Sequence, residues 1–248
     1  MTAVLRAELL KQRSTRTNLG LFATMLGLVL LAALLHGFGL PARGLDSAAR
    51  QLMLLAPGEI IGTLLAALLG AMSITGEIRH GTIRPTLLVS PERSRVITAK
   101  VWTSMLVGAG FGFAAGAVTA GVSTVALQAR GITIHLDAGD YILPLVGGAA
   151  AAALWAAIGV GVGAVVRHQA ATLVGLCAWL LFVETLLLRD LTNLDVGRFL
   201  PGAAAAALSG QMPETPLLAP TAALVLLLLY AAAAILAGRV ATNRRDVA

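Results

Sequence analysis

The chain has 248 residues, of which 58% are hydrophobic and only 12% are charged. Soluble domains carry about 25% charged residues, so a soluble core could not bury this much apolar surface and lipid must be the solvent for much of the chain. The net charge of +6 does not indicate nucleic acid. The positive residues gather at the ends of apolar runs, where membrane topology places them, and the few aromatic residues provide no stacking platform for bases.

Residues that could hold a metal or a disulfide are few and scattered. Cys177 is the only cysteine and lies inside an apolar run, where a small buried hydrophobe is the expected role. Neither a disulfide within the chain nor a cysteine-based metal site can be built. The histidines have no ligand spacing; they are His36, His80, His135 and His168. We therefore predict no metal site and no cofactor in this chain.

The chain begins with a basic segment, residues 3–16, in which charged residues alternate with leucines. This pattern predicts an amphipathic helix lying in the membrane interface, with a solvated tail as the alternative. The apolar run at 19–38 is too long for the apolar region of a signal peptide, and no small-residue cleavage site follows it cleanly. We expect an uncleaved first span.

Six apolar runs are long enough for membrane spans. The predicted spans are residues 19–38, 53–75, 101–127, 141–166, 170–188 and 217–238. The short turn Arg167-His168-Gln169 joins the fourth and fifth spans in an antiparallel hairpin. Between the fifth and sixth, residues 199–208 are apolar but too short to cross, so they predict a short re-entrant or surface helix that begins near Pro201.

Small residues recur at helical spacing in the third and fourth spans. Glycines four residues apart lie on one helix face and let two helices approach closely in lipid. The predicted packing residues are Gly108, Gly112, Gly116, Gly159 and Gly163.

Only two acidic residues, and no lysine or arginine, lie within the predicted spans, and both are near the outer ends. Glu59 follows Pro57-Gly58 and either lines a polar path or helix interface, or reaches the headgroups because its helix begins there. Glu184 either meets Arg189 near the outer interface or faces a cavity. Both are candidates for a substrate path or a helix interface.

The positive charge sets the expected orientation. The loops at 39–52, 128–140 and 189–216 carry few of the 18 Lys and Arg residues; theirs are Arg43, Arg50, Arg130, Arg189 and Arg198. The N-terminal segment, the loop at 76–100, the 167–169 turn and the C-terminal tail carry the rest. The positive-inside rule therefore predicts cytoplasmic termini, in one all-α polytopic transmembrane domain over residues 1–248.

The chain shows no catalytic motif. It has no phosphate-binding Gly-x-x-x-x-Gly-Lys-Ser/Thr loop, no His-Glu-x-x-His helix and no Gly-x-Ser-x-Gly turn. With so few ionisable groups in the spans, coupling to protons or ions is also poorly supported. We expect that the chain is not an enzyme by itself and that any transport is driven by a partner.

The polar stretch from Gly76 to Arg95 separates the second and third spans. Gly81 permits a sharp turn, and Thr82 can cap a short amphipathic helix with Pro85 in its first turn. Ser90-Pro91 then opens a new helix into the third span. Such a helix, held between two span ends, could receive force from a soluble partner or could anchor the loop in lipid.

This stretch resembles the cytoplasmic segment of type-2 ABC exporter permeases. The similarity rests on Gly76-Glu77-Ile78-Arg79-His80-Gly81-Thr82, the leucine-rich turn after it, and Ser90-Pro91 followed by Arg93. Ile78 departs from the usual aromatic residue. The Glu8-Leu9-Leu10-Lys11 segment is similar to the opening helix of the family, and Leu200-Pro201 resembles its external loop.

The resemblance implies a six-span permease with a coupling helix between spans two and three. That helix docks on a separate ABC ATPase subunit, expected in two copies and carrying the ATP and magnesium, while a second permease subunit, identical or related, completes the path. The expected coupling residues are Glu77, Arg79, His80, Gly81, Thr82, Arg84, Pro85, Pro91 and Arg93.

The expected location is a bacterial inner membrane, and the uncharged span interiors favour an apolar or amphipathic cargo such as a drug, antibiotic, peptide or lipid. A non-transporting membrane anchor, or an immunity or sensor protein that binds a ligand on its extracellular loops, is the alternative function.

Overall fold

The structure is a computed structural model that describes residues 2–82, 93–184, 186, 196–210 and 217–244. Its elements are α1 (Thr2–Ser14), α2 (Arg16–Gly39), η1 (Ala42–Gly44), α3 (Ala48–Leu52), η2 (Met53–Leu55), α4 (Ala56–Arg79), α6 (Arg93–Ala129), α7 (Ala138–Val166), α8 (Gln169–Ala178), η3 (Trp179–Val183), η5 (Gly197–Phe199), α10 (Pro201–Leu208) and α11 (Pro220–Arg244). The all-helical prediction is confirmed, since the described residues contain no strand.

Five helices of the described chain are long and apolar enough to cross a membrane, as expected of a multi-pass membrane protein. They are Arg16–Gly39, Ala48–Arg79, Ser94–Ala129, Ala138–Val166 and Pro220–Arg244. The predicted fifth span, 170–188, is shorter in the structure, with 10 residues of α-helix in α8 and 5 of π-helix in η3. At 1.5 Å per residue these cover roughly 22 Å, less than the hydrocarbon thickness, and most of residues 185–188 lie outside the described part.

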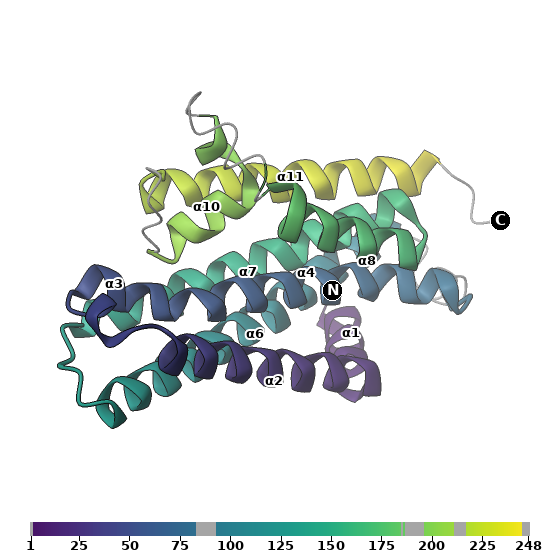
Figure 1. Ribbon diagram of the computed structural model, residues 1–248. Coiled ribbons are helices and arrows are strands. Elements are labelled where there is room, and N and C mark those ends of the chain that lie inside the picture. Colours follow the sequence, from purple (N-terminus) through teal and green to yellow (C-terminus); the bar gives the residue numbers. More distant parts are fainter. Residues whose placement is uncertain (1, 83–92, 185, 187–195, 211–216, 245–248) are drawn as a thin grey trace.

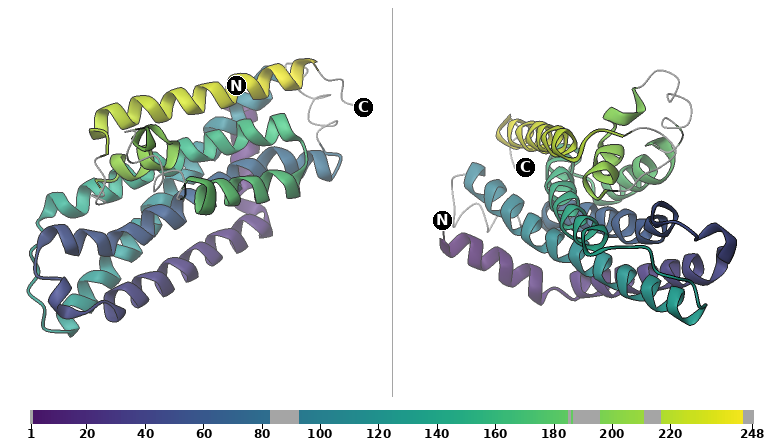
Figure 2. Two further views of the ribbon diagram at one scale, coloured as in Figure 1. Left: turned by 45° about the horizontal axis from the view of Figure 1, so that its top comes forward. Right: turned by 90° about the vertical axis from the view of Figure 1, so that its left-hand side faces the viewer.

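The long helices form one bundle, and the start of α2 and the end of α11 lie at the same end of it (Figure 1). α1 runs across the long helices instead of along them (Figure 2). A break at Thr15 separates α1 from α2. α10 and α3 both lie toward the opposite end from α1 (Figure 1).

α7 is the centre of the bundle and packs against α4, α6 and α11. Its contact with α4 is a close approach of two backbones. A Cβ atom on Gly159 would lie 2.1 Å from Ala67 O, and one on Gly70 would lie 2.0 Å from Ala156 O. Only glycine fits these positions. Helices in lipid rely on such close contacts because the hydrophobic effect does not drive them to associate there.

The predicted packing glycines all lie along α7 contacts. Gly108, Gly112 and Gly116 of α6 face α7, and a Cβ on Gly112 would lie 2.6 Å from Gly148 O. Gly163 faces α4, where a Cβ would lie 2.9 Å from Ile74 Cγ2. α7 is thus clamped between α4 and α6.

The end of the bundle away from α1 is closed by polar contacts between its loops. Gln51 is fully buried; it donates to Leu45 O at 3.0 Å and Thr133 O at 2.9 Å, and accepts from His135 N at 2.9 Å. Arg130 donates to Gly37 O and Leu40 O at the carboxyl end of α2, where a positive charge is favourable. The loops 39–52 and 128–140 are therefore held together.

We predict that Gly159→Ala lowers stability by about 1–3 kcal/mol, because the new methyl group overlaps the Ala67 backbone. The midpoint of thermal unfolding in detergent measures the effect.

Gly110→Ala in α6 is the control. A Cβ there meets nothing within 4 Å, so the substitution should be neutral or should stabilise the helix by about 0.5–1 kcal/mol. Equal midpoints for the two variants would contradict the close approach of α4 and α7.

Candidate functional site: a buried ion network

The segment predicted to receive a partner begins where α4 ends. Gly81 has φ of 69° and directly follows His80, the C-cap of α4. Thr82 N donates to Glu77 O at 3.0 Å, and Gly81 N donates to Ile78 O at 3.3 Å. This pair of bonds defines a Schellman motif, in which glycine is favoured because of its positive φ.

The predicted short helix after Thr82 lies outside the described residues, and with it Arg84, Pro85 and Pro91. α6 begins at Arg93, whose side chain is also outside the description. The structure therefore describes only the base of the segment, which consists of the end of α4 before it and the start of α6 after it.

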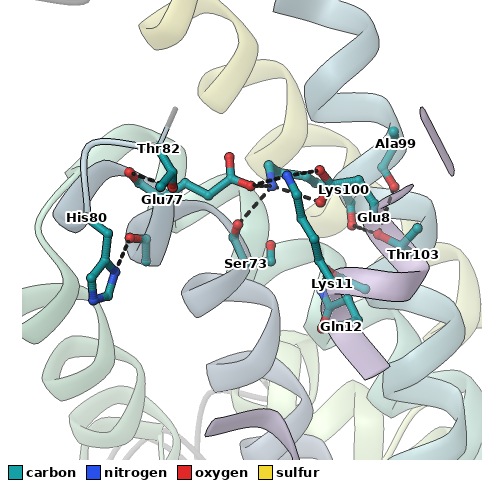
Figure 3. A network of polar contacts seen from close by, with 12 residues as sticks. Glu8, Lys11, Gln12, Ser73, Glu77, His80, Thr82, Ala99, Lys100 and Thr103 are labelled. Carbon is teal, nitrogen blue, oxygen red and sulfur yellow. Dashed lines mark hydrogen bonds and ion pairs between the residues drawn. The ribbon is translucent and has the colours of Figure 1, made fainter. Parts of the chain in front are cut away.

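A buried lysine stands at this base. Lys100 of α6 is 1% exposed. Its Nζ lies 2.9 Å from Glu8 Oε2 of α1 and 2.8 Å from Glu77 Oε1 of α4, and it donates to Ser73 O at 3.1 Å. Figure 3 shows these groups converging from three helices. All three hydrogens of the ammonium group thus have acceptors.

Lys11 of α1 completes the network from the solvent side. Its side chain is 51% exposed, and its Nζ lies 3.1 Å from Glu8 Oε1 and 3.0 Å from Glu77 Oε1. Burial lowers the pKa of Lys11, but hydrogen bonds and charge attraction, first from Glu77 and then from Glu8, outweigh it, and the net pKa is raised. Two lysines and two glutamates therefore form a neutral group.

α1 is held to α6 by polar side chains rather than by its leucines. Glu8 and Gln12, one turn apart, are both buried, and Gln12 Nε2 donates to Ser104 Oγ at 3.4 Å. Asn18 of α2 donates to Gln12 O at 3.0 Å and to Gln12 Oε1 at 2.8 Å. Leu10 is 66% exposed. The polar face of α1 thus meets the protein.

An open pocket of about 560 Å³ adjoins the network. α4, α6 and the α1–α2 junction supply most of its wall, and Gln169 of α8 supplies the rest. Gln169 Oε1 accepts from Arg79 Nη1 at 3.1 Å, and His80 Nδ1 lies 2.7 Å from Gly76 O. The expected coupling residues Glu77, Arg79, His80 and Thr82 all line this pocket.

The two membrane carboxylates lie elsewhere. Glu59, in the first turn of α4, is 7% exposed and accepts from Thr63 Oγ1 at 3.0 Å. It borders a cavity of about 10 Å³ beside Gly112 and Gly116, roughly the space of one water. The cavity is too small to be a substrate path in this conformation.

Glu184 is 3% exposed and accepts hydrogen bonds from the backbone of α10. Arg189, its possible sequence partner, lies outside the described residues. The structure therefore adds a contact that the sequence did not suggest, between a carboxylate and the amino end of a helix.

Glu8 and Lys100 were not among the predicted site residues. Lys100 was predicted to lie in the cytoplasmic loop 76–100, whereas it lies inside α6 and is buried. One feature of the sequence could have indicated the network. The chain has only two lysines, Lys11 and Lys100, and both belong to it. Among the residues with described positions, no group of three or more His, Cys, Asp or Glu side chains could hold a metal.

No known protein-family model matches the chain, and no curated protein matches it.

We predict that Lys100→Met destabilises the protein by about 3–5 kcal/mol, because Glu8 and Glu77 would be left as neighbouring buried carboxylates with only Lys11 to balance them. Thermal unfolding in detergent reports the loss.

Lys11→Met is the matched control. The half-exposed Lys11 side chain should contribute about 1 kcal/mol or less. A Lys11→Met variant as unstable as Lys100→Met would show that burial of the Lys100 ammonium is not what makes the network important.

Proposed function

We propose that the chain is the membrane-spanning subunit of an ATP-driven ABC exporter. The observation that carries the proposal is the ion network at the base of the 76–95 segment. Glu77 belongs both to the motif on which the resemblance to type-2 exporter permeases rests and to the network that joins α1, α4 and α6. A push on the segment would therefore act on three helices at once.

The mechanism follows from how the segment is attached. The Schellman motif and Arg79–Gln169 contact fix the α4 side, and α6 runs without interruption from Arg93 into the bundle. Because α4 and α6 both pack on α7 through glycines, motion at the segment is transmitted as displacement of helices. ATP hydrolysis belongs to two separate ATPase subunits, and this chain supplies no catalytic group.

The proposed arrangement has both termini in the bacterial cytoplasm. In this proposal α8 and η3 belong to a fifth crossing and α11 is the sixth, consistent with α2 beginning and α11 ending at the same end of the bundle. A second permease subunit would cover part of the apolar surface that α2 and α11 expose; their most hydrophobic stretches are only 17% and 22% buried. Lipid covers the rest, and the cargo is apolar or amphipathic.

We predict that the double charge reversal Arg84→Glu/Arg93→Glu abolishes copurification with the expected ABC ATPase subunit when the two are coexpressed. Reversed charges place repulsion at the docking segment, where mismatched charges cost several kcal/mol. The measurement is the ATPase-to-permease ratio after affinity purification through the permease.

The control is Arg43→Glu/Arg50→Glu, which makes the same charge change in the loop expected on the other side of the membrane. It should leave the ratio unchanged. Association that survives Arg84→Glu/Arg93→Glu would contradict the proposal, and ligand protection that persists without any ATPase would favour an immunity or sensor protein.

We also predict the orientation from two single cysteines, placed at the exposed positions Ser47 and Ser94 in a Cys177→Ala background. A membrane-impermeant maleimide added to intact cells should label Ser47→Cys and spare Ser94→Cys until the membrane is permeabilised. The reverse pattern would place the coupling segment outside and remove the proposed ATPase contact.

A further inference from the structure

The amino end of α10 lacks a cap of its own. Leu200 occupies the N-cap and has no side chain that can accept a hydrogen bond, and Pro201 follows at the first helical position. The amides of Gly202 and Ala203 are therefore among the donors that a helix cannot satisfy internally. Both donate to Glu184 Oε1, which lies 2.9 Å from Ala203 N.

Apart from these amides and the side chain of Trp179, Glu184 has little to balance its charge. It is 3% exposed, and none of the ion pairs among the described residues includes it. A buried carboxylate is costly unless it is paired. The positive end of the α10 dipole and the two amides supply the compensation, so Glu184 and the amino end of α10 depend on each other.

The carboxyl end of α10 is held in a different way. A Cβ on Gly147 of α7 would lie 2.1 Å from Leu208 O, so the two backbones are in direct contact. Gly210 follows with φ of 71°, and a Cβ there would lie 2.6 Å from Leu143 Cδ2. This end is held by close backbone packing. At the amino end, Pro201 and Ala203 are also buried, and polar contacts are added to that packing, including the bond from Tyr230 Oη to Phe199 O at 3.0 Å.

We propose that Glu184 is a releasable latch for α10, with its carboxylate holding the amino end while the Gly147–Leu208 contact is the pivot. When the carboxylate withdraws, the amino end of α10 swings away from Glu184 and the carboxyl end stays on α7. The π-helix Trp179–Val183 lies directly before Glu184. Such segments are rare and frequently lie at functional sites, and a local change in their winding can move the carboxylate without moving all of α8.

Amide hydrogen exchange of the purified full-length chain in detergent, resolved to single residues, tests the latch. Glu184→Met removes both acceptor oxygens at nearly constant length. It should accelerate exchange at Gly202 and Ala203 by about tenfold or more, the loss expected for hydrogen bonds to a charged group. Glu184→Gln keeps one neutral acceptor and should give a smaller acceleration.

Two further variants keep the test decisive. Gly202→Ala places a methyl group 2.8 Å from the Glu184 carboxylate and should loosen Ala203 while leaving Glu184 in the sequence, so it replaces Glu184→Met if that variant does not fold. Glu59→Met, on the other carboxylate within the predicted spans, should not alter exchange in α10.

Two results would overturn the proposal. The first is unchanged exchange at Gly202 and Ala203 in both Glu184→Met and Gly202→Ala. The second is an equal acceleration along all of α10 and in α7 around Gly147, which would mean general loosening instead of release at one end. The latch concerns α10 alone and does not depend on an ATPase partner.

Discussion

One ammonium group shared by two carboxylates governs the end of the bundle where the 76–95 segment is attached. Moving a single lysine from water to the interior costs several kcal/mol, which only well-placed partners offset. Lys100 has three acceptors, from α1, α4 and the α4 backbone. If α1 moved away from α6, the Lys100 ammonium would lose the Glu8 carboxylate, one of its three acceptors. The three helices are therefore constrained to move as one body at this end.

The glycine contacts extend that constraint into the bundle. Where backbones touch, as at Gly159 and Ala67 or Gly112 and Gly148, neither helix can slide without a clash, and packed interiors respond to displacement by shifting between discrete arrangements. α7 is the helix that both α4 and α6 touch in this way. It therefore links the ion network at one end with α10 at the other.

The long helices were predicted well from the sequence, because hydropathy and length determine which segments can form a helix that spans lipid. Glycine spacing also predicted which face of α6 would pack closely. The ion network could not be found in this way, since Glu8 and Lys100 are 92 residues apart and a lysine near a span end is usually interpreted as reaching for the interface. The predicted fifth span, 170–188, was less secure because a π-helix interrupts it, and no periodic pattern signals a π-helix.

Glu184 shows why the sequence left its role open. A lone carboxylate in an apolar run can line a path, meet an arginine or cap a helix, and only the position of the partner decides among these. Here the partner is the amino end of α10, whose own N-cap is a leucine. Neither the carboxylate nor the helix end is stable in lipid alone, since each leaves polar groups without partners. A serine or aspartate at position 200 could cap α10 permanently without burying a carboxylate. The use of Glu184 in its place supports a contact that forms in one conformation and opens in another.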